Sequence, residues 1–355
     1  EDGNHGECRP RAHEFIDDGV PFIRAADMST GVVDFEHAGK INNEARSRIR
    51  KGIGLPNDIL LSHKGTVGKI AVAPASSPDF VCSPQTTFWR SLNRDLLDQR
   101  YLRFYMDSEP FQRQLRNLMG QTDMAPYVSL TDQRSLRLVV PEIAQQRAIA
   151  EVLGALDDKI AANVRVADKA TELAWASFFR AAANGETRQL SAYTSLMTRG
   201  GAPSYVDRGL AVLNQKCIRH QRVSLDQARL TDPVKVRADR LLVKDDVLIN
   251  STGVGTLGRV ARWVHETEAT VDSHITIVRF NESLVDPVCA GFALLAQQPL
   301  IESMAEGSTG QTELRKSLLE GLVIGLPPLA TQRRIGRSLS DLAELEAQKL
   351  TENAQ

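Results

Sequence analysis

The sequence predicts a mixed α/β fold in which two globular domains are separated by two long antiparallel coiled-coil helices, with a pseudo-twofold internal repeat. Three observations lead to this prediction: an unusually long helical pattern in mid-chain, a second copy of its beginning near the C-terminus, and shorter motifs that occur twice in the same order. At 355 residues the chain is long enough for two domains with hydrophobic cores of their own.

The first long helix is expected over residues 145–179. Its apolar residues recur at steps of three or four residues or multiples of these. Within this stretch no Gly or Pro follows Gly154. Roughly 35 to 40 residues at about 1.5 Å each make a rod on the order of 55 Å long, which one small domain cannot bury. We therefore expect it to pack against a second helix at residues 332–350. The packing residues are expected to be Ile149, Leu153, Leu156, Ile160, Ile335, Leu339, Leu342 and Leu345.

One polar residue, Asn163, falls near this apolar stripe. A polar side chain there can fix the register of two helices at some cost in stability. The alternative is that Asn163 points to the edge of the stripe, and the sequence does not decide between the two.

The duplicated motifs are separated by about 186 to 190 residues, so a whole domain with its helix is repeated. Each copy has a strand entry (20–24, 210–214), an acid-led strand (58–62, 246–250), a Gly turn (63–71, 251–261), a β-branched strand (83–88, 273–278), a helical segment (101–119, 287–304), a Gly-Gln loop, and a closing strand (136–141, 322–327). The expected boundaries are 1–140 for the first domain, 141–185 for the first helix, 186–326 for the second domain and 327–355 for the second helix.

Composition excludes several classes of protein. The sequence contains no run of 18 apolar residues, so a membrane span is not expected. The four Cys are scattered without a CxxC pair, which argues against a zinc cluster or a disulfide framework and favours a reducing cytoplasm. The first residue is Glu1 and no signal-peptide pattern follows, so the start resembles a trimmed end.

The net charge of −1 hides an uneven distribution. Residues 40–69 carry seven Lys or Arg against two acids, and residues 208–262 carry eleven against five. Local basic surfaces, more than the total charge, determine attraction to a phosphate backbone. Solvated faces of ordinary domains would explain the same counts.

The motifs that usually indicate catalysis are missing. Gly253, Gly255 and Gly258 spell a dinucleotide-binding pattern, but they lie between two expected strands and do not open a helix. We expect instead a Gly-rich hairpin, with Lys69 and Arg259 at equivalent places as candidate phosphate contacts. Metal-ligand spacing, a Ser-His-Asp order, a phosphate-binding loop and the Asn-Pro-Pro-aromatic tetrapeptide of adenine methyltransferases are not found.

With its motifs duplicated in the same order, the sequence resembles the specificity subunit of bacterial and archaeal type I restriction-modification enzymes. The resemblance covers essentially the whole length. It rests on the acid-led strand and its Gly turn (58–71, 246–261), on residues 212–218, and above all on residues 141–160 and 327–342. Each motif alone is loose, but two ordered copies are specific.

The resemblance implies that each domain is a target recognition domain reading one half of a split, asymmetric DNA sequence, while the two helices act as a spacer. It also implies two methyltransferase subunits docked on the helices, and restriction subunits in the full complex. S-adenosylmethionine, ATP and Mg would belong to these partners, and this chain would be a non-catalytic cytoplasmic protein with no cofactor and no metal.

Base readout needs amide, hydroxyl, imidazole or basic side chains on loops. The candidate DNA-binding residues are Ser62, His63, Lys64, Lys69, Gln85, Gln121, Gln215, Lys216, Asn250, Ser251, Thr252, Arg259, His274 and Gln311. Two departures from the family matter: residues 1–19 lack the strand that residues 189–191 begin in the second copy, and the second helix is shorter than the first. If its end is truncated, docking of one methyltransferase would be weakened. The alternatives are a protein-interaction scaffold without DNA readout and part of a fused DNA-modifying enzyme.

Overall fold

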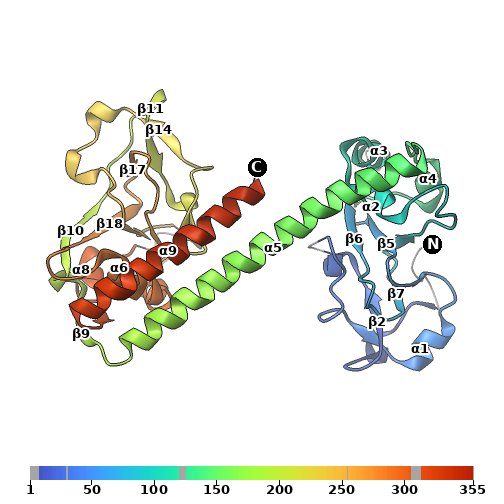
Figure 1. Ribbon diagram of the computed structural model, residues 1–355, viewed down its shortest axis with the longest axis horizontal. Helices are drawn as coiled ribbons and strands as arrows, with labels where there is room; N and C mark the ends of the chain where they lie inside the picture. The colour runs from blue at the N-terminus through green and yellow to red at the C-terminus, as the bar shows by residue number, and fades with distance from the viewer. Residues whose placement is uncertain (1–7, 29–30, 120–124, 254, 305–312, 355) are drawn as a thin grey trace. The chain divides into compact units, whose positions relative to one another are not determined.

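The chain divides into two compact units, Glu1–Lys159 (unit 1) and Ile160–Gln355 (unit 2). The computed structural model describes residues 8–28, 31–119, 125–253, 255–304 and 313–354. Helix α5 (Ile143–Ala182) begins in unit 1 and ends in unit 2 (Figure 1). Each unit combines small β-sheets with helices, which confirms the predicted mixed α/β fold.

Unit 1 is built on two small sheets. Its described strands are β1 (Phe15–Ile16), β2 (Val20–Ile23), β3 (Lys40–Ile41), β4 (Ile53–Gly54), β5 (Ile59–Lys64), β6 (Thr66–Val72), β7 (Phe80–Cys82) and β8 (Thr86–Trp89). One sheet has the order β1-β3-β2-β7-β4 and the other β6-β5-β8. Strand β5 is antiparallel to both its neighbours, whereas β2 and β7 are parallel.

Strand β5 is the centre of the core of unit 1 because both of its faces are buried. The other described helices of unit 1 are α1 (Asn43–Arg48), α2 (Gln99–Asp107), α3 (Glu109–Met119) and α4 (Leu130–Ser135). Ile59 and Leu61 pack with buried residues of α2 and α3, while Leu60 packs with β2 and β7 on the other side. Side chains along a strand alternate between faces, so an uninterrupted apolar run serves two cores at once.

Unit 2 repeats this plan with more strands. They are β9 (Glu186–Gln189), β10 (Thr194–Arg199), β11 (Tyr205–Leu213), β12 (Ile218–Arg219), β13 (Arg222–Val223), β14 (Arg229–Thr231), β15 (Val247–Asn250), β16 (Val260–Arg262), β17 (Ala269–Val271), β18 (Ile275–Phe280) and β19 (Val323–Leu326). The sheet orders are β10-β18-β15-β16, β14-β11-β17, β12-β13 and β19-β9. Helices α6 (Pro287–Ala296), α7 (Gln298–Ser303), α8 (Lys316–Glu320) and α9 (Leu329–Ala354) follow.

The central strands of the two units are held in the same way. Asp58, at the start of β5, accepts two hydrogen bonds of 2.6 Å from the Arg90 guanidinium. Asp246, at the start of β15, accepts two from Arg279, at 2.8 and 2.7 Å. Both carboxylates are 1% exposed. The aspartate that leads each of these strands in the sequence repeat therefore forms an ion pair through its buried carboxylate.

The strand pairing corrects one alignment of the sequence repeat. Residues 83–88 were expected to correspond to 273–278, but Leu61 pairs with Thr87 and Ile249 pairs with Thr276. Thr87 therefore corresponds to Thr276, one residue away from the predicted match. A slip of one residue moves every side chain to the other face of a strand, so an apolar pattern on both faces leaves it undetected.

The prediction of a closing strand is wrong for the first copy. Residues 136–141 form no strand, whereas the equivalent residues of the second copy form β19. Strand β19 is paired with β9, and among the described residues unit 1 has no strand that corresponds to β9. Without a neighbouring strand the backbone of 136–141 has no ladder to join.

Each expected helical segment, 101–119 and 287–304, is in fact two helices. The first is divided at Ser108, and the second ends its first helix at the cap residue Gln297. Pro110 and Pro299 are the second residues of α3 and α7. Proline lacks the N–H that would continue a preceding helix but is tolerated in a first turn.

The two long helices confirm that part of the predicted architecture, and they run antiparallel within unit 2. The side chain of Asn163 on α5 donates to Asn353 on α9 at 2.9 Å, and Thr171 donates to Glu346 at 2.6 Å. Asn163 is 7% exposed, so it lies in the helix contact and not at its edge. No described helix is both long and apolar enough to cross a membrane.

The apolar stripe of α5 is buried over only part of its length, which corrects the expected packing. Ala167, Ala174 and Phe178 are buried in unit 2. By contrast Ile149, Leu156 and Ile160 are 40%, 51% and 45% exposed, and Leu153 is only half-buried. Contact with α9 begins where Asn353 donates to the Ile160 carbonyl, so this earlier part of the stripe is largely open to solvent. On α9, Ile335 and Leu339 are buried, while Leu342 and Leu345 are half-buried.

A buried glutamine joins the start of each long helix to the domain before it. Gln146 Oε1 accepts from the Asp98 N–H at 2.9 Å, and its amide nitrogen donates to the carbonyls of Leu96 and Pro141. In unit 2, Gln332 likewise accepts from the Asp286 N–H and donates to the Pro327 carbonyl. Asp98 and Asp286 cap α2 and α6, so the glutamine fixes each long helix to the N-terminus of the domain helix.

Candidate nucleic-acid interface

In unit 1 the candidate residues gather at the tight turn between β5 and β6. Gly65 has a φ of +79° there, a conformation that glycine adopts at no steric cost. A later segment lies beside this turn: Gly65 N donates to Pro126 O, and Val128 N donates to His63 O, both at 2.9 Å. The end of β5 is thus flanked by chain that is more than sixty residues away in sequence.

This arrangement exposes three polar side chains together, which we call turn surface 1: Lys64, Gln85 and Tyr127. Lys64 Nζ lies 6.0 Å from the centre of the Tyr127 ring, and Gln85 is placed by the hydrogen bond from His63 N to its carbonyl. Tyr127 is 42% exposed, and Lys64 and Gln85 are exposed as well. An ammonium, an amide and an aromatic ring can bind phosphate, base edges and base faces respectively.

Unit 2 has a longer loop, residues 251–259, at the equivalent place. Leu314 N donates to Ser251 O and Ser251 N donates to His274 O, both at 2.8 Å, so the same kind of flanking segment is present. Thr252 Oγ1 lies 2.6 Å from His274 Nδ1. Gln215 approaches the loop so closely that a Cβ on Gly253 would lie 2.2 Å from its Oε1. We call Gln215, Lys216, Thr252 and His274 turn surface 2.

Four candidates are buried and serve the turns themselves. Their exposed fractions are at most 1%, and each bonds within the protein: Ser62 to Lys69 N, His63 to Val128 O, Asn250 to Gln215 O and Thr256 O, and Ser251 to Thr276. A side chain with no exposed surface cannot reach a ligand in this conformation. We therefore assign Ser62, His63, Asn250 and Ser251 to the support of the loops.

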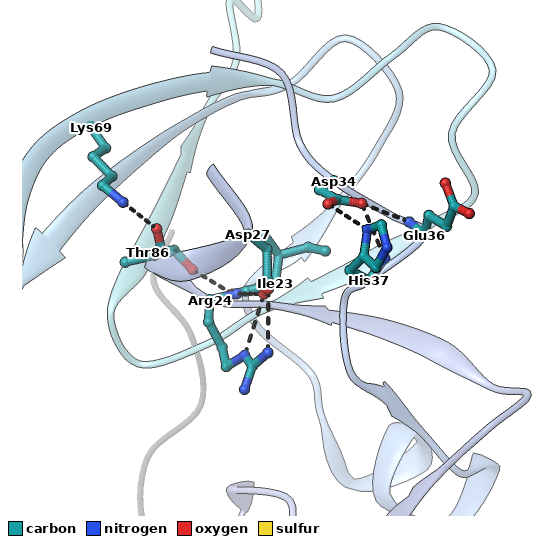
Figure 2. Close-up of polar contacts among 9 residues, drawn as sticks. Ile23, Arg24, Asp27, Asp34, Glu36, His37, Lys69 and Thr86 are labelled. Atoms are coloured by element: carbon teal, nitrogen blue, oxygen red, sulfur yellow. Dashed lines mark hydrogen bonds and ion pairs between the residues drawn. The ribbon is translucent and has the colours of Figure 1, made fainter. Parts of the chain in front are cut away.

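Lys69 and Arg259 occupy equivalent positions, as the sequence repeat predicted. Lys69 Nζ donates to the Ala25 carbonyl at 3.1 Å, and Figure 2 shows the side chain turned toward the segment between Ile23 and Asp27. Arg259 donates to the Gly255 carbonyl at 2.8 Å. Both cations hold their own domain together and are only partly exposed, so they are placed less favourably for a phosphate than Lys64.

Two candidates and one missed residue complete the picture. Gln121 and Gln311 lie outside the described residues. Tyr127 was missed in the sequence because no periodicity marks it. In the structure, Val128 N and Leu314 N donate to equivalent residues at the ends of the two central strands, and this correspondence points to the residue before each of them, which is Tyr127 in unit 1. The same comparison finds Arg199, which forms an ion pair with Glu313 and donates to the Leu314 carbonyl.

Two of the buried cysteines are poor nucleophiles near neutral pH. Burial raises the pKa of the Cys289 thiol to about 12 and also raises the pKa of Cys217. Only the ionised thiol is an effective nucleophile. The described part of the chain also holds no group of three His, Cys, Asp or Glu side chains arranged to bind a metal ion. His37, whose pKa is raised by its hydrogen bond to Asp34, belongs to a separate surface turn (Figure 2).

Comparisons with known proteins concern the family and the fold. The family model described as Type I restriction modification DNA specificity domain matches residues 5–169 and 230–353. The chain is similar in fold to the crystal structure of a type I restriction-modification system S subunit from M. genitalium, with 14% identity, a TM-score of 0.67, and coverage of 100% of this chain and 89% of that one. Comparison with curated proteins gives no match.

A second solved structure, the HsdS subunit from Thermoanaerobacter tengcongensis, is 15% identical with a TM-score of 0.38, covering 95% of this chain and 85% of that chain. At these identities the likeness concerns the fold. The TM-score of 0.67 for the M. genitalium structure supports this likeness over the whole chain.

Proposed function

Because the chain belongs to the family of type I restriction-modification DNA specificity subunits, we propose that its two units each read one half of a two-part DNA sequence. The observation that supports this most directly is the duplicated frame. An Asp–Arg pair and a flanking segment present turn surface 1 in unit 1 and turn surface 2 in unit 2. The frames are alike but the exposed residues differ, as two unlike half-sites require.

Within each surface the residues have distinct roles in this proposal. Lys64 and Lys216 neutralise phosphates, which sets position and affinity without selecting a sequence. Gln85 and His274 offer hydrogen bonds to base edges, and Tyr127 offers a ring that can stack or contact a base. Gln85 and His274 occupy matching places, since the carbonyl of Gln85 accepts from His63 N and that of His274 accepts from Ser251 N, the equivalent residue of unit 2.

The long helices have a separate role. We propose that α5 and α9 set the gap between the half-sites and dock the methyltransferase subunits. The partly exposed apolar residues Ile149, Leu156 and Ile160 support a protein contact on α5. S-adenosylmethionine, ATP and Mg would be bound by the partner subunits, and this chain would select the site without catalysing a reaction.

The test is to co-express the chain with its cognate methyltransferase subunit and to map methylated adenines across the genome. We expect methylation at one two-part motif with a fixed unspecified gap. Gln85→Ala should relax one half of the motif only, and His274→Ala the other half only. The matched controls Asp95→Asn and Glu282→Gln, which change exposed residues away from the turns, should leave the motif unchanged.

Two outcomes would contradict the proposal. A complex that forms normally but methylates no defined motif would favour the protein-interaction scaffold. Methyl transfer by the isolated chain would favour the fused DNA-modifying enzyme.

In a binding assay with random duplex, Lys64→Ala should lower the slope of log affinity against log salt concentration by about one, because one phosphate contact is lost.

A further inference from the structure

Unit 2 contains a pocket of about 280 Å³ between its recognition domain and the two long helices. Trp175 on α5 and Phe292 on α6 form an apolar corner, with ring centres 5.1 Å apart. Ala343 on α9 forms part of another wall, and Arg262, from the end of β16, also lines the pocket. The pocket therefore combines apolar walls with a buried cation.

Arg262 is unusual because its buried guanidinium has only loose partners: an ion pair with Asp245 and the Phe292 ring, whose centre lies 5.6 Å from Cζ. The residue is 6% exposed, and its buried Nη1 has no hydrogen-bond acceptor in the described part of the chain. The nearest carboxylate oxygen, on Asp245, is 3.6 Å from Nη1, beyond a good hydrogen bond. Burial also lowers the pKa of this guanidinium. A buried charge without hydrogen bonds is costly, so the site favours an acceptor supplied from outside.

Unit 1 shows what kind of acceptor is absent. There, Arg103 on α2 donates to the carboxylate of Asp157 on α5 at 2.6 Å. Aligning the two long helices on Gln146 and Gln332 places Ala343 at the position of Asp157. The helix caps Asp98 and Asp286 likewise place Gly291 at the position of Arg103.

In unit 2 the arginine therefore comes from the sheet. A Cβ on Gly291 would lie 3.2 Å from Arg262 Cδ, so the glycine leaves room for this side chain. The methyl group of Ala343 cannot accept a hydrogen bond. The unit thus keeps a guanidinium at this helix contact but has lost the carboxylate that unit 1 provides on its long helix.

The mouth of the pocket is already organised by other residues. Glu346 accepts a hydrogen bond from Thr171 at 2.6 Å and forms an ion pair with Arg222, so its charge is already compensated. His220 and Gln221, in the turn between β12 and β13, both have positive φ, at +50° and +60°. A two-residue hairpin turn of this type has positive φ at both of its residues, so the turn itself accounts for this conformation.

We propose that this pocket binds a small carboxylate with an apolar or aromatic body. The carboxylate would bond to the Arg262 guanidinium, taking the part that Asp157 has in unit 1. The apolar body would lie against Trp175 and Phe292. A bound molecule would contact α5, α6 and α9 together, so it would stabilise unit 2. The inference goes beyond DNA recognition and does not depend on it.

The experiment uses the full chain with phenylacetate and indole-3-acetate as probes, and the corresponding amides as neutral controls of the same shape. We expect both carboxylates to raise the melting temperature and to bind about tenfold or more tightly than their amides, because a charge-assisted hydrogen bond is lost in the amide. Arg262→Gln should abolish this preference. Equal binding of acid and amide, or no binding of any probe up to millimolar concentration, would overturn the proposal.

A second variant keeps the test decisive if Arg262→Gln unfolds. Ala343→Asp restores on α9 the carboxylate that unit 1 has on α5. It should raise the melting temperature of the free protein and lower probe affinity about tenfold or more, because the internal carboxylate occupies the guanidinium. The control Arg337→Asp, on an exposed face of α9, should change neither. Unchanged probe binding in Ala343→Asp would contradict the assignment.

Discussion

Units 1 and 2 share the frame beneath their turn surfaces and differ in what that frame presents. In both, a buried aspartate at the start of the central strand holds an arginine of the adjacent strand, and a buried glutamine ties the long helix to the cap of the domain helix. Above the frame, unit 1 has a tight Gly65 turn with Lys64 beside Tyr127, whereas unit 2 has a longer loop with Thr252 beside His274.

This difference teaches how one fold can carry two specificities. The polar groups that fix the strands are 1% exposed at Asp58 and Asp246, so they are isolated from whatever the loops contact. The exposed loop residues can change without disturbing them, because surface substitutions away from buried networks cost little stability. If this is correct, damage to the frame should affect both units alike, and changes to the surfaces should not.

The largest effect is expected from the buried aspartates. Asp58→Asn and Asp246→Asn should each cost about 3 kcal/mol of unfolding free energy, since each leaves a guanidinium without its charged partner. This value is at the low end of the cost usually found for breaking a buried ion pair, because Arg90 and Arg279 are 28% and 26% exposed. Amide hydrogen exchange resolved by peptide should show faster exchange in unit 1 for the first variant and in unit 2 for the second.

The matched controls are Asp95→Asn in unit 1 and Glu282→Gln in unit 2, both at exposed positions. They remove the same charge without touching a buried pair, so their stability should stay within about 0.5 kcal/mol of the wild type. A loss of several kcal/mol in only one of the two aspartate variants would show that the frames are not energetically equivalent.

A smaller loss of unfolding free energy is expected from substituting the two buried glutamines, and we expect the loss to be larger at Gln146 than at Gln332. Gln146→Ala removes hydrogen bonds to Asp98, Leu96 and Pro141 and should cost about 2 to 3 kcal/mol. Gln332→Ala removes bonds to Asp286 and Pro327 and should cost about 2 kcal/mol. Urea unfolding measures both. The exposed neighbours Gln145→Ala and Arg333→Ala are the controls, and a Gln146 variant as stable as its control would refute this role for the glutamine.

Much of this frame could be predicted from the sequence, because it depends on patterns of residues that are close together in the chain. The apolar run after Asp58 and Asp246, the Gly turns, and the long helix all follow from spacing along the chain. Gln146 and Gln332 were noticed as equivalent, but their partners lie about fifty residues away, at Asp98 and Asp286, and spacing carries no information about them. The arginines that pair with the aspartates were missed for the same reason.

The errors at the candidate site have a related physical cause. Chemical type made Ser62, His63, Asn250 and Ser251 look like contact residues, yet polar residues at the buried end of a strand must bond to nearby backbone and side chains. Exposure depends on segments that return from elsewhere, such as Tyr127 and Val128. A residue's chemistry could be read from the sequence, but whether it faces solvent could not.

The smallest expected effect concerns acid, and it can be isolated at Glu14 of unit 1. The hydrogen bond from Arg48, then that from the Arg11 N–H, lowers the pKa of Glu14 from 4.5 to about 2. Burial has the opposite effect elsewhere, where it raises the pKa of Asp107 in unit 1 and of Asp245 and Asp272 in unit 2. A carboxyl whose pKa is lowered by folding stabilises the folded state above its unfolded pKa, and this contribution disappears as the pH falls from 4.5 toward 2.

Asp107, Asp245 and Asp272 act in the opposite direction, since the folded protein holds their protons more tightly than the unfolded chain. Glu14→Gln removes the titrating group while keeping a hydrogen-bond acceptor for Arg48. Urea unfolding from about pH 6 to about pH 2 should therefore show the variant less stable than the wild type at the upper end, with the difference shrinking as the pH falls. Asp95→Asn, at an exposed position elsewhere in unit 1, is the control. A gap between Glu14→Gln and the wild type that stays constant down to pH 2 would mean that Glu14 contributes through packing, and that its ionisation does not stabilise unit 1.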